Sequence, residues 1–207
     1  MYEVRAVKLQ NPNSNVIGIA SFVVDGKFAF NGIRVIESAN AERGFFLAMP
    51  SYKTGEDKYI DYFHPISSDM AQNLADAVQR ALGADVTIRV GDEPTKISLD
   101  MKLVDDSNSK IKARVTMRLG QDFICENIAL REGSNGLFVS YPSYQAKDGK
   151  YKNYCNPITK EYNQEIESKL LDNYKLMNVA KENKEGPKVA EPQIDYSVDE
   201  PEPAKVK

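Results

Sequence analysis

The sequence predicts an α+β fold made of two tandem units, each a small antiparallel β-sheet followed by a C-terminal amphipathic helix. Three observations support this prediction. They are a long internal repeat, alternating apolar and polar runs between turn residues, and an apolar stripe at helical spacing after each copy of the repeat. The order of strands first and a helix last indicates antiparallel strands in each unit.

The internal repeat is clearest in residues 44–66, which return 92 positions later as residues 136–158. The two segments are GFFLAMPSYKTGEDKYIDYFHPI and GLFVSYPSYQAKDGKYKNYCNPI, and ten of their 23 positions are identical. A fixed offset through such an irregular segment is typical of a duplicated structural unit. Upstream the offset becomes 95 at Ile33 and Ile128, and slips of this kind belong in loops. Units of this size fold alone only marginally, so the two units are expected to share an interface.

Residues 1–83 form the first unit, called copy one. Its expected extended segments are 2–10, 15–24, 27–37, 45–51 and 58–63, separated by turn residues such as Asp25-Gly26 and Gly55. A helix follows, because Ser67 or Ser68 offers an N-cap oxygen and Gly83 suits the helix end.

Residues 96–180 form the second unit, called copy two. It repeats the order with a strand to Val104, strands at 110–119 and 122–130, a hairpin turn at Asp148-Gly149, and a helix from Thr159. Residues 84–95 are the expected linker, in which VTIRV is able to add a strand. From residue 181 to 207 the chain is charged and proline-rich, and we expect a disordered tail there.

An apolar stripe runs along both expected helices. Its members are Met70, Leu74, Val78 and Leu82 in copy one, and Tyr162, Ile166, Leu170 and Tyr174 in copy two. The remaining faces are acidic rather than basic, so neither helix is suited to a DNA groove.

Two segments of copy one, NGIRVIES at 31–38 and GFFLAMPSYKTGEDKYIDYFHPISS at 44–68, resemble the SpoVG family of small bacterial proteins, named for sporulation and septation. In that family an IRVI strand, a GLFVAMPS strand, a glycine-containing hairpin, HPI and a final helix follow in this order. Copy two resembles a diverged second unit, because IALR at 128–131 replaces IRVI and Asn156 replaces the histidine.

The resemblance implies DNA or RNA binding, without a cofactor, and a regulatory role in septation, sporulation or gene expression. It also implies a dimer in single-domain members, so the tandem chain is expected to be a monomer with an internal pseudo-two-fold interface. The motif positions expected to be structural are Arg34, Pro50, His64, Pro65, Pro142 and Pro157. We expect Arg34 to pair with Glu3 or Glu37, with a phosphate or partner contact as the alternative. We expect His64 to fix the helix start through a side-chain hydrogen bond.

Nucleic-acid binding requires clustered cations, and one strand has them. In KIKARVTMR, alternation places four cations on one face, namely Lys110, Lys112, Arg114 and Arg118. The alternative is an ordinary solvated sheet face whose charges are neutralised by cross-strand acids such as Glu126.

The hairpins supply a second set of candidate nucleic-acid-binding lysines: Lys53, Lys58, Lys147, Lys150 and Lys152. They flank four tyrosines, Tyr52, Tyr59, Tyr144 and Tyr151. Lysine beside an exposed aromatic ring suits phosphate contact plus base stacking. The alternative is that the tyrosines pack across the hairpins while the lysines protect the strand edges.

Composition limits the function further. The net charge is −3 and the pI about 5.4, so the chain as a whole is not basic, and a non-catalytic protein-interaction module is the alternative function. No catalytic motif is present, so we expect no enzyme. Cys125 and Cys155 occupy positions that hold Phe30 and Phe63 in copy one, which indicates small apolar fillers rather than a redox pair or metal ligands. No apolar run reaches a membrane span and no signal peptide is evident, so a cytoplasmic protein is expected.

Overall fold

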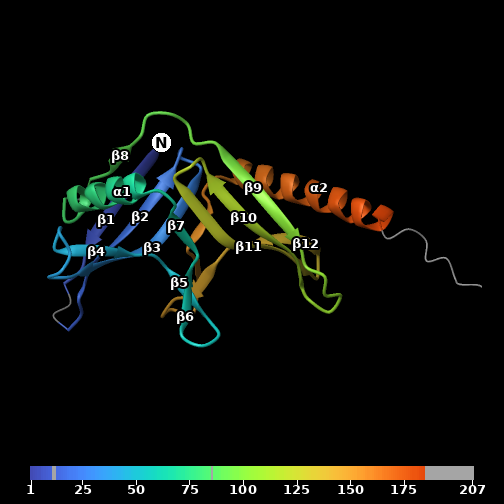
Figure 1. Cartoon of the computed structure of the whole chain (residues 1–207), viewed down its shortest axis with the longest axis horizontal. Coiled ribbons are helices and arrows are strands. Elements are labelled where there is room, and N and C mark those ends of the chain that lie inside the picture. The colour runs from blue at the N-terminus through green and yellow to red at the C-terminus, as the bar shows by residue number, and fades with distance from the viewer. Residues whose placement is uncertain (11–12, 85, 185–207) are drawn as a thin grey trace, which may run out of the picture.

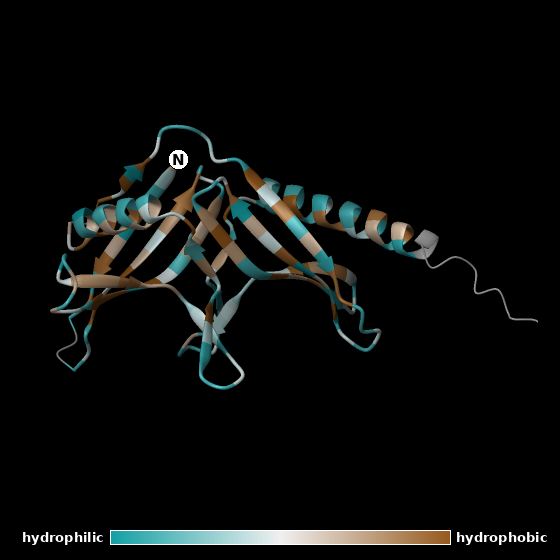
Figure 2. Ribbon diagram, in the orientation of Figure 1, coloured by the Kyte–Doolittle hydropathy of each residue, from teal (hydrophilic) through white to brown (hydrophobic). Residues whose placement is uncertain are grey.

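The computed structural model describes residues 1–10, 13–84 and 86–184, and it confirms the α+β class with antiparallel sheets. Two larger sheets meet near the middle of the molecule, and short hairpins project together below their junction (Figure 1). Hydrophobic and hydrophilic residues alternate along the strands (Figure 2). The alternation buries one face of each sheet, and the buried side chains of both copies form one continuous hydrophobic core.

The described residues of copy one form seven strands and a helix. They are β1 (Tyr2–Lys8), β2 (Val16–Val24), β3 (Phe28–Glu37), β4 (Phe45–Ala48), β5 (Ser51–Thr54), β6 (Lys58–Asp61), β7 (Phe63–Pro65) and α1 (Ser68–Ala81). The linker adds β8 (Ile88–Val90), which pairs with β1. Asp25 and Gly26, with φ of 49° and 64°, form the tight turn expected between β2 and β3.

Copy two repeats the order of strands and helix found in copy one. Its elements are β9 (Ile97–Leu103), β10 (Ile111–Leu119), β11 (Phe123–Gly133), β12 (Gly136–Ser140), β13 (Ser143–Gln145), β14 (Tyr151–Asn153), β15 (Cys155–Pro157) and α2 (Lys160–Lys184). One sheet has the order β15-β3-β2-β1-β8 with β4 also on β3, and the other has the order β12-β11-β10-β9 with β7 also on β11.

The strand expected at 45–51 is interrupted at Pro50, and the one expected at 58–63 is interrupted at Tyr62. There the chain leaves the large sheet to form the hairpin β5–β6, closed by a hydrogen bond from Tyr62 N to the Pro50 carbonyl at 2.9 Å. Copy two repeats this geometry, because Tyr154 N donates to the Pro142 carbonyl at 2.8 Å. Periodicity alone did not separate the hairpin from the sheet strands.

The short strand after each hairpin pairs with the other copy. In register, β7 sets Phe63, His64 and Pro65 opposite Cys125, Ile124 and Phe123, and β15 sets Cys155, Asn156 and Pro157 opposite Phe30, Ala29 and Phe28. These two sets of pairs are equivalent under the repeat. Each sheet therefore contains a strand from the other copy, as expected of a pseudo-dimer formed within one chain.

Phenylalanines and cysteines meet where the exchanged strands pair. The rings of Phe30 and Phe63 lie 4.9 Å apart between centroids, and the Sγ atoms of Cys125 and Cys155 lie 3.2 Å apart. Both cysteines are free and buried, as expected of apolar fillers. Burial raises the pKa of the Cys155 thiol well above its ordinary value, which keeps that thiol protonated at neutral pH.

Each helix packs mainly on its own copy. In α1 the buried residues include Met70, Leu74 and Val78, and this face lies against β1 and β8. In α2 the buried residues are Ile166 and Leu170, and the helix contacts β9, β12 and β15. Because α2 continues to Lys184, the first four residues of the expected tail are helical, and the rest of the tail lies outside the described residues.

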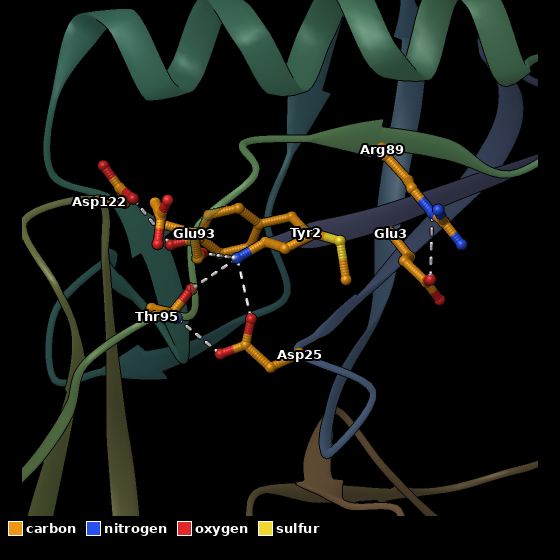
Figure 3. Close-up of polar contacts among 8 residues, drawn as sticks. Tyr2, Glu3, Asp25, Arg89, Glu93, Thr95 and Asp122 are labelled. Carbon is orange, nitrogen blue, oxygen red and sulfur yellow. Dashed lines mark hydrogen bonds and ion pairs between the residues drawn. The ribbon is translucent and has the colours of Figure 1, made fainter.

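A polar network joins the start of the chain to both copies (Figure 3). The Met1 ammonium group donates to Asp25 Oδ1 at 2.9 Å and to Thr95 Oγ1 at 3.1 Å, while Thr95 N donates to Asp25 Oδ2 at 2.7 Å. Nearby, the Tyr2 hydroxyl donates to Asp122 Oδ2 at 2.9 Å, from copy one to copy two. The carboxylate of Asp25 thus connects the β2–β3 turn to the linker.

We expect Asp25→Ala to lower the free energy of unfolding by about 1–3 kcal/mol, because it removes the acceptor of two charge-assisted hydrogen bonds and leaves their donors half-buried. Urea denaturation measures the change. Asp92→Ala is the matched control, since Asp92 is exposed and should change stability by less than about 0.5 kcal/mol. Equal losses in the two variants would contradict the role given to the network.

We expect Tyr141→Phe to raise the free energy of unfolding by about 1 kcal/mol, because the Tyr141 hydroxyl is buried without a hydrogen-bond partner among the described residues. Burial also raises the pKa of Tyr141, so the unfolded chain ionises first as the pH passes about 10. Ionisation of Tyr141 therefore leaves the free energy of unfolding unchanged below that pH and lowers it as the pH rises above it. Urea denaturation at pH 8 and at pH 10.5 measures this drop in the free energy of unfolding. The drop should be smaller for Tyr141→Phe than for the exposed control Tyr151→Phe.

Candidate nucleic-acid interface

The expected cationic face of β10 exists, but acids neutralise half of it. Ala113, Val115, Met117 and Leu119 are buried, and the cations alternate with them as predicted. Lys112 Nζ lies 2.9 Å from Glu132 Oε2, and Arg118 Nε lies 3.4 Å from Asp100 Oδ2. The neutralising acids are therefore Glu132 and Asp100 rather than the expected Glu126.

Two of the four candidate cations, Lys110 just before β10 and Arg114 within it, have no acidic partner among the described residues. Arg114 Nη1 donates to the neutral Asn127 Oδ1 at 3.3 Å, and Lys110 is exposed with no ion pair among the described residues. The predicted track of four cations is thus reduced to two. This correction could not be made from the strand itself, because both acids lie on neighbouring strands.

The copy-one hairpin lies beside this face of copy two. A groove of about 620 Å³ is lined by Tyr52 and Thr54 of β5 together with Arg114 and Thr116 of β10. The exchange of β7 explains the proximity, because the chain must cross to the other sheet directly after the hairpin. The two sets of candidate residues, hairpin and sheet face, therefore belong to one surface.

Four tyrosines form a ladder across the junction of the two copies. Successive ring centroids are 5.0 Å apart from Tyr52 to Tyr62, 5.0 Å from Tyr62 to Tyr154, and 4.8 Å from Tyr154 to Tyr144. Neighbouring planes differ by 31°, 25° and 29°, so the rings are close to parallel. We name these four residues the tyrosine ladder. It holds the two hairpins together.

Of the four candidate tyrosines, two pack against other rings and two are exposed. Tyr52 and Tyr144 pack into the ladder, as the structural alternative predicted, whereas Tyr59 and Tyr151 are 65% and 73% exposed. Sequence reasoning missed Tyr62 and Tyr154 as members of the site. Their position at the offset of 92 was the available signal, because equivalent residues beside a pseudo-two-fold axis come close together.

The two central tyrosines of the ladder, Tyr62 and Tyr154, have raised pKa values. Burial, followed by the neighbouring tyrosines, raises the pKa of Tyr62. Burial and Tyr144 raise the pKa of Tyr154, while the nearby charge of Arg34 opposes the shift. At neutral pH Tyr62 and Tyr154 therefore keep their hydroxyl hydrogens and add no phenolate charge beside the cations.

Most hairpin lysines are available for an anionic ligand. Lys53 pairs with Asp57 at 2.7 Å, in a pair whose side chains are 52% and 93% exposed. Within the described residues, no ion pair reaches the other four, which are Lys58, Lys147, Lys150 and Lys152. Three of these four lie on the copy-two hairpin. The positive charge is thus concentrated on that hairpin.

Arg34 does not have the predicted partner. Its side chain is exposed and pairs with neither Glu3 nor Glu37, and Glu3 instead lies 3.6 Å from Arg89 of β8 (Figure 3). The sequence did not indicate that β8 would add to β1 and bring Arg89 opposite Glu3. Because Arg34 acts on Tyr154 electrostatically, it belongs to the surroundings of the tyrosine ladder.

The expected role of His64 at the helix start is wrong. The side chain of His64 makes no hydrogen bond within the described residues, and Ser67 Oγ accepts the hydrogen bond from Met70 N at 3.1 Å that caps α1. His64 instead lies in the exchanged strand β7, opposite Ile124. The position of this segment is fixed by the backbone pairing of β7 with β11 of the other copy.

Over the described ranges there is no group of three or more histidine, cysteine, aspartate or glutamate residues placed to hold a metal ion. Neither α1 nor α2, as far as the structure describes them, has the length and apolar character needed to cross a bilayer.

The fold and this surface define a class of protein: one chain that builds, from two diverged copies, the strand-exchanged pseudo-dimer of a small α+β unit. The SpoVG family model matches residues 1–83 and 95–176. The chain therefore belongs to the SpoVG family, as a tandem duplication with both copies recognisable.

Relatives support the same assignment. The chain is 33% identical over 81 residues to "Putative septation protein SpoVG" of Acetivibrio thermocellus, an alignment that covers 39% of this chain and 86% of the relative. The protein of the same name from Finegoldia magna is 43% identical over 72 residues, covering 35% of this chain and 64% of the relative. Each alignment spans about one copy, so these relatives are about half as long as this chain.

Proposed function

We propose that this protein is a SpoVG-type regulator that binds DNA or RNA through its paired hairpins and acts in septation, the process in its relatives' names, or in a related step of sporulation or gene expression. The observation that carries the proposal is a set of hairpin lysines without acidic partners beside exposed tyrosines. Lysines supply phosphate contacts and exposed rings supply base stacking, which together suit an unpaired strand.

The hairpins are well placed for this role. They project from the body of the molecule (Figure 1), and the tyrosine ladder fixes their spacing. Arg114 extends the same surface onto β10, while the pairs of Lys112 and Arg118 leave little free charge elsewhere on that strand. Because only a few free cations are present, we expect weak binding that depends strongly on salt.

The alternative function is a protein-interaction module with little affinity for nucleic acid. The neutralised cations of β10 and the low pI favour it. The two functions differ in one measurable property, since phosphate binding weakens as salt rises and a predominantly apolar protein interface does not.

We expect the triple variant Lys147→Glu, Lys150→Glu, Lys152→Glu to bind single-stranded RNA about 100-fold more weakly at 0.1 M salt, because three phosphate contacts are lost. Gel-shift titrations at two salt concentrations, with single-stranded RNA and duplex DNA, measure the change. Tyr151→Ala should cost about tenfold or more through lost stacking. Arg114→Glu should weaken binding more than Lys112→Glu, whose lysine is already paired.

The matched control carries the same charge change on other elements: Lys8→Glu, Lys96→Glu, Lys160→Glu, all at exposed positions. It should retain most of the affinity. Equal losses in both triple variants would show that only net charge matters, and would contradict a site on the hairpins. No shift of either nucleic acid at micromolar wild-type protein would overturn the proposed function.

We also propose that the protein is a monomer, because the exchanged strands that a family dimer would share are already paired within the chain. Light scattering coupled to size-exclusion chromatography should give the mass of one chain, 23.2 kDa. A stable mass of two chains over a tenfold dilution series would contradict this arrangement.

A further inference from the structure

Copy one contains a pocket that lies apart from the lysine-bearing loop of the copy-two hairpin. It has a volume of about 720 Å³ and lies between β4, the hairpin β5–β6 and the outward side of α1. Apolar side chains form most of its wall, among them Phe45, Leu47 and Met49, and Ala71 and Ala75 of α1 leave room above them. This size and this lining are typical of a ligand site.

One acid on the pocket wall, Asp61, lies close to His64. Asp61 is half-buried, and its carboxylate makes no hydrogen bond or ion pair among the described residues. Burial raises the pKa of Asp61, and the nearby His64 opposes that shift. Glu42 adds a second acid to the wall, while the cation Arg43 is held by Asp76 at 2.7 Å. The pocket therefore favours a cationic group and repels phosphate.

An open strand edge borders the pocket. The Ser38 amide donates to the Gly44 carbonyl at 2.9 Å, so alternation turns the backbone groups of Phe45 and Leu47 away from β3. In the described part of the chain, no other strand pairs with β4. These backbone groups are free to accept an added strand, the arrangement by which many domains bind extended peptides.

The equivalent positions in copy two differ in the residues that open and charge the pocket. Under the repeat, Met49 becomes Tyr141, Asp61 becomes Asn153, His64 becomes Asn156, Ala71 becomes Asn163 and Ala75 becomes Glu167. Glu167 lies close enough to Tyr141 to help raise the pKa of its phenol. Larger side chains thus occupy the space that two alanines leave open in copy one.

We propose that copy one binds an extended peptide segment of a partner protein along the open edge of β4, with an apolar side chain in the pocket and a lysine or arginine paired with Asp61. The backbone edge supplies affinity, and the apolar wall and the unpaired carboxylate select a basic and apolar sequence. This interaction goes beyond nucleic-acid binding and does not depend on it.

A displayed library of random nonapeptides tests the proposal. The library is selected on the full-length protein and counter-selected on Ala75→Glu, which places the copy-two residue on a half-exposed helix position and so leaves folding intact. We expect enriched sequences that alternate apolar residues with lysine or arginine. Enrichment of acidic sequences, or no enrichment, would overturn the proposal.

An enriched peptide, made synthetically with a fluorescent label, then gives dissociation constants by fluorescence polarisation. We expect at least a tenfold loss for Ala75→Glu and a three- to tenfold loss for Asp61→Asn, and no binding after every lysine or arginine of the peptide is changed to glutamate. The matched control is Glu167→Gln at the equivalent position of copy two, which should bind as the wild type does. Equal binding by wild type and Ala75→Glu would contradict the site.

The two proposed activities fail separately. Ala75→Glu should leave the gel shift with single-stranded RNA unchanged, and the triple hairpin variant Lys147→Glu, Lys150→Glu, Lys152→Glu should leave peptide binding within about twofold. Loss of both activities in either variant would show that the pocket and the hairpins are one site, and would overturn the assignment of the pocket to a peptide.

Discussion

The pairing of β7 with β11 and of β15 with β3 is the interaction on which the rest of this structure depends. In each copy, the strand that precedes the helix pairs with the sheet of the other copy. Neither sheet is therefore complete without a strand from the other copy. The crossing brings both hairpins to the junction and places Tyr62 beside Tyr154. A surface that spans two copies is thus a direct consequence of backbone hydrogen bonds between them.

The side chains at the junction suit this pairing better than pairing between identical copies. In the exchanged strands Phe30 lies opposite Cys155, and Phe63 lies opposite Cys125, so each pair combines a large and a small side chain. Two copy-one units would place four phenylalanines there, and overpacking costs about 1–3 kcal/mol. Two copy-two units would place four cysteines there and leave cavities, which are also destabilising. Complementary volume therefore favours exchange within one chain.

Local features of this fold could be predicted from the sequence, and long-range ones could not. The Asp25-Gly26 turn, the alternation of β10 and the capped start of α1 depend on neighbouring residues, and each was correctly predicted. The three-residue strand β7 is too short for its periodicity to indicate a partner, so the exchange could not be derived. The partner of Lys112 depends on the register with Glu132, twenty residues away. The free charges of the candidate site could not be predicted from the sequence, because ion pairs between neighbouring strands determine which cations remain free.

The two copies have diverged so that the copy-two hairpin is net positive and the copy-one hairpin is net negative. The copy-two hairpin has three lysines against Asp148, whereas the copy-one hairpin has two lysines against Glu56, Asp57 and Asp61. These charges favour phosphate contact on the copy-two hairpin over the copy-one hairpin, and they favour a basic peptide beside the copy-one hairpin. In a symmetric dimer, any change at one hairpin would be repeated at the other. Duplication within one chain removes that constraint, because each copy mutates separately while the shared core preserves their relative positions. Substitutions on the copy-two hairpin can therefore change its charge without changing the copy-one pocket, although one core joins the two copies.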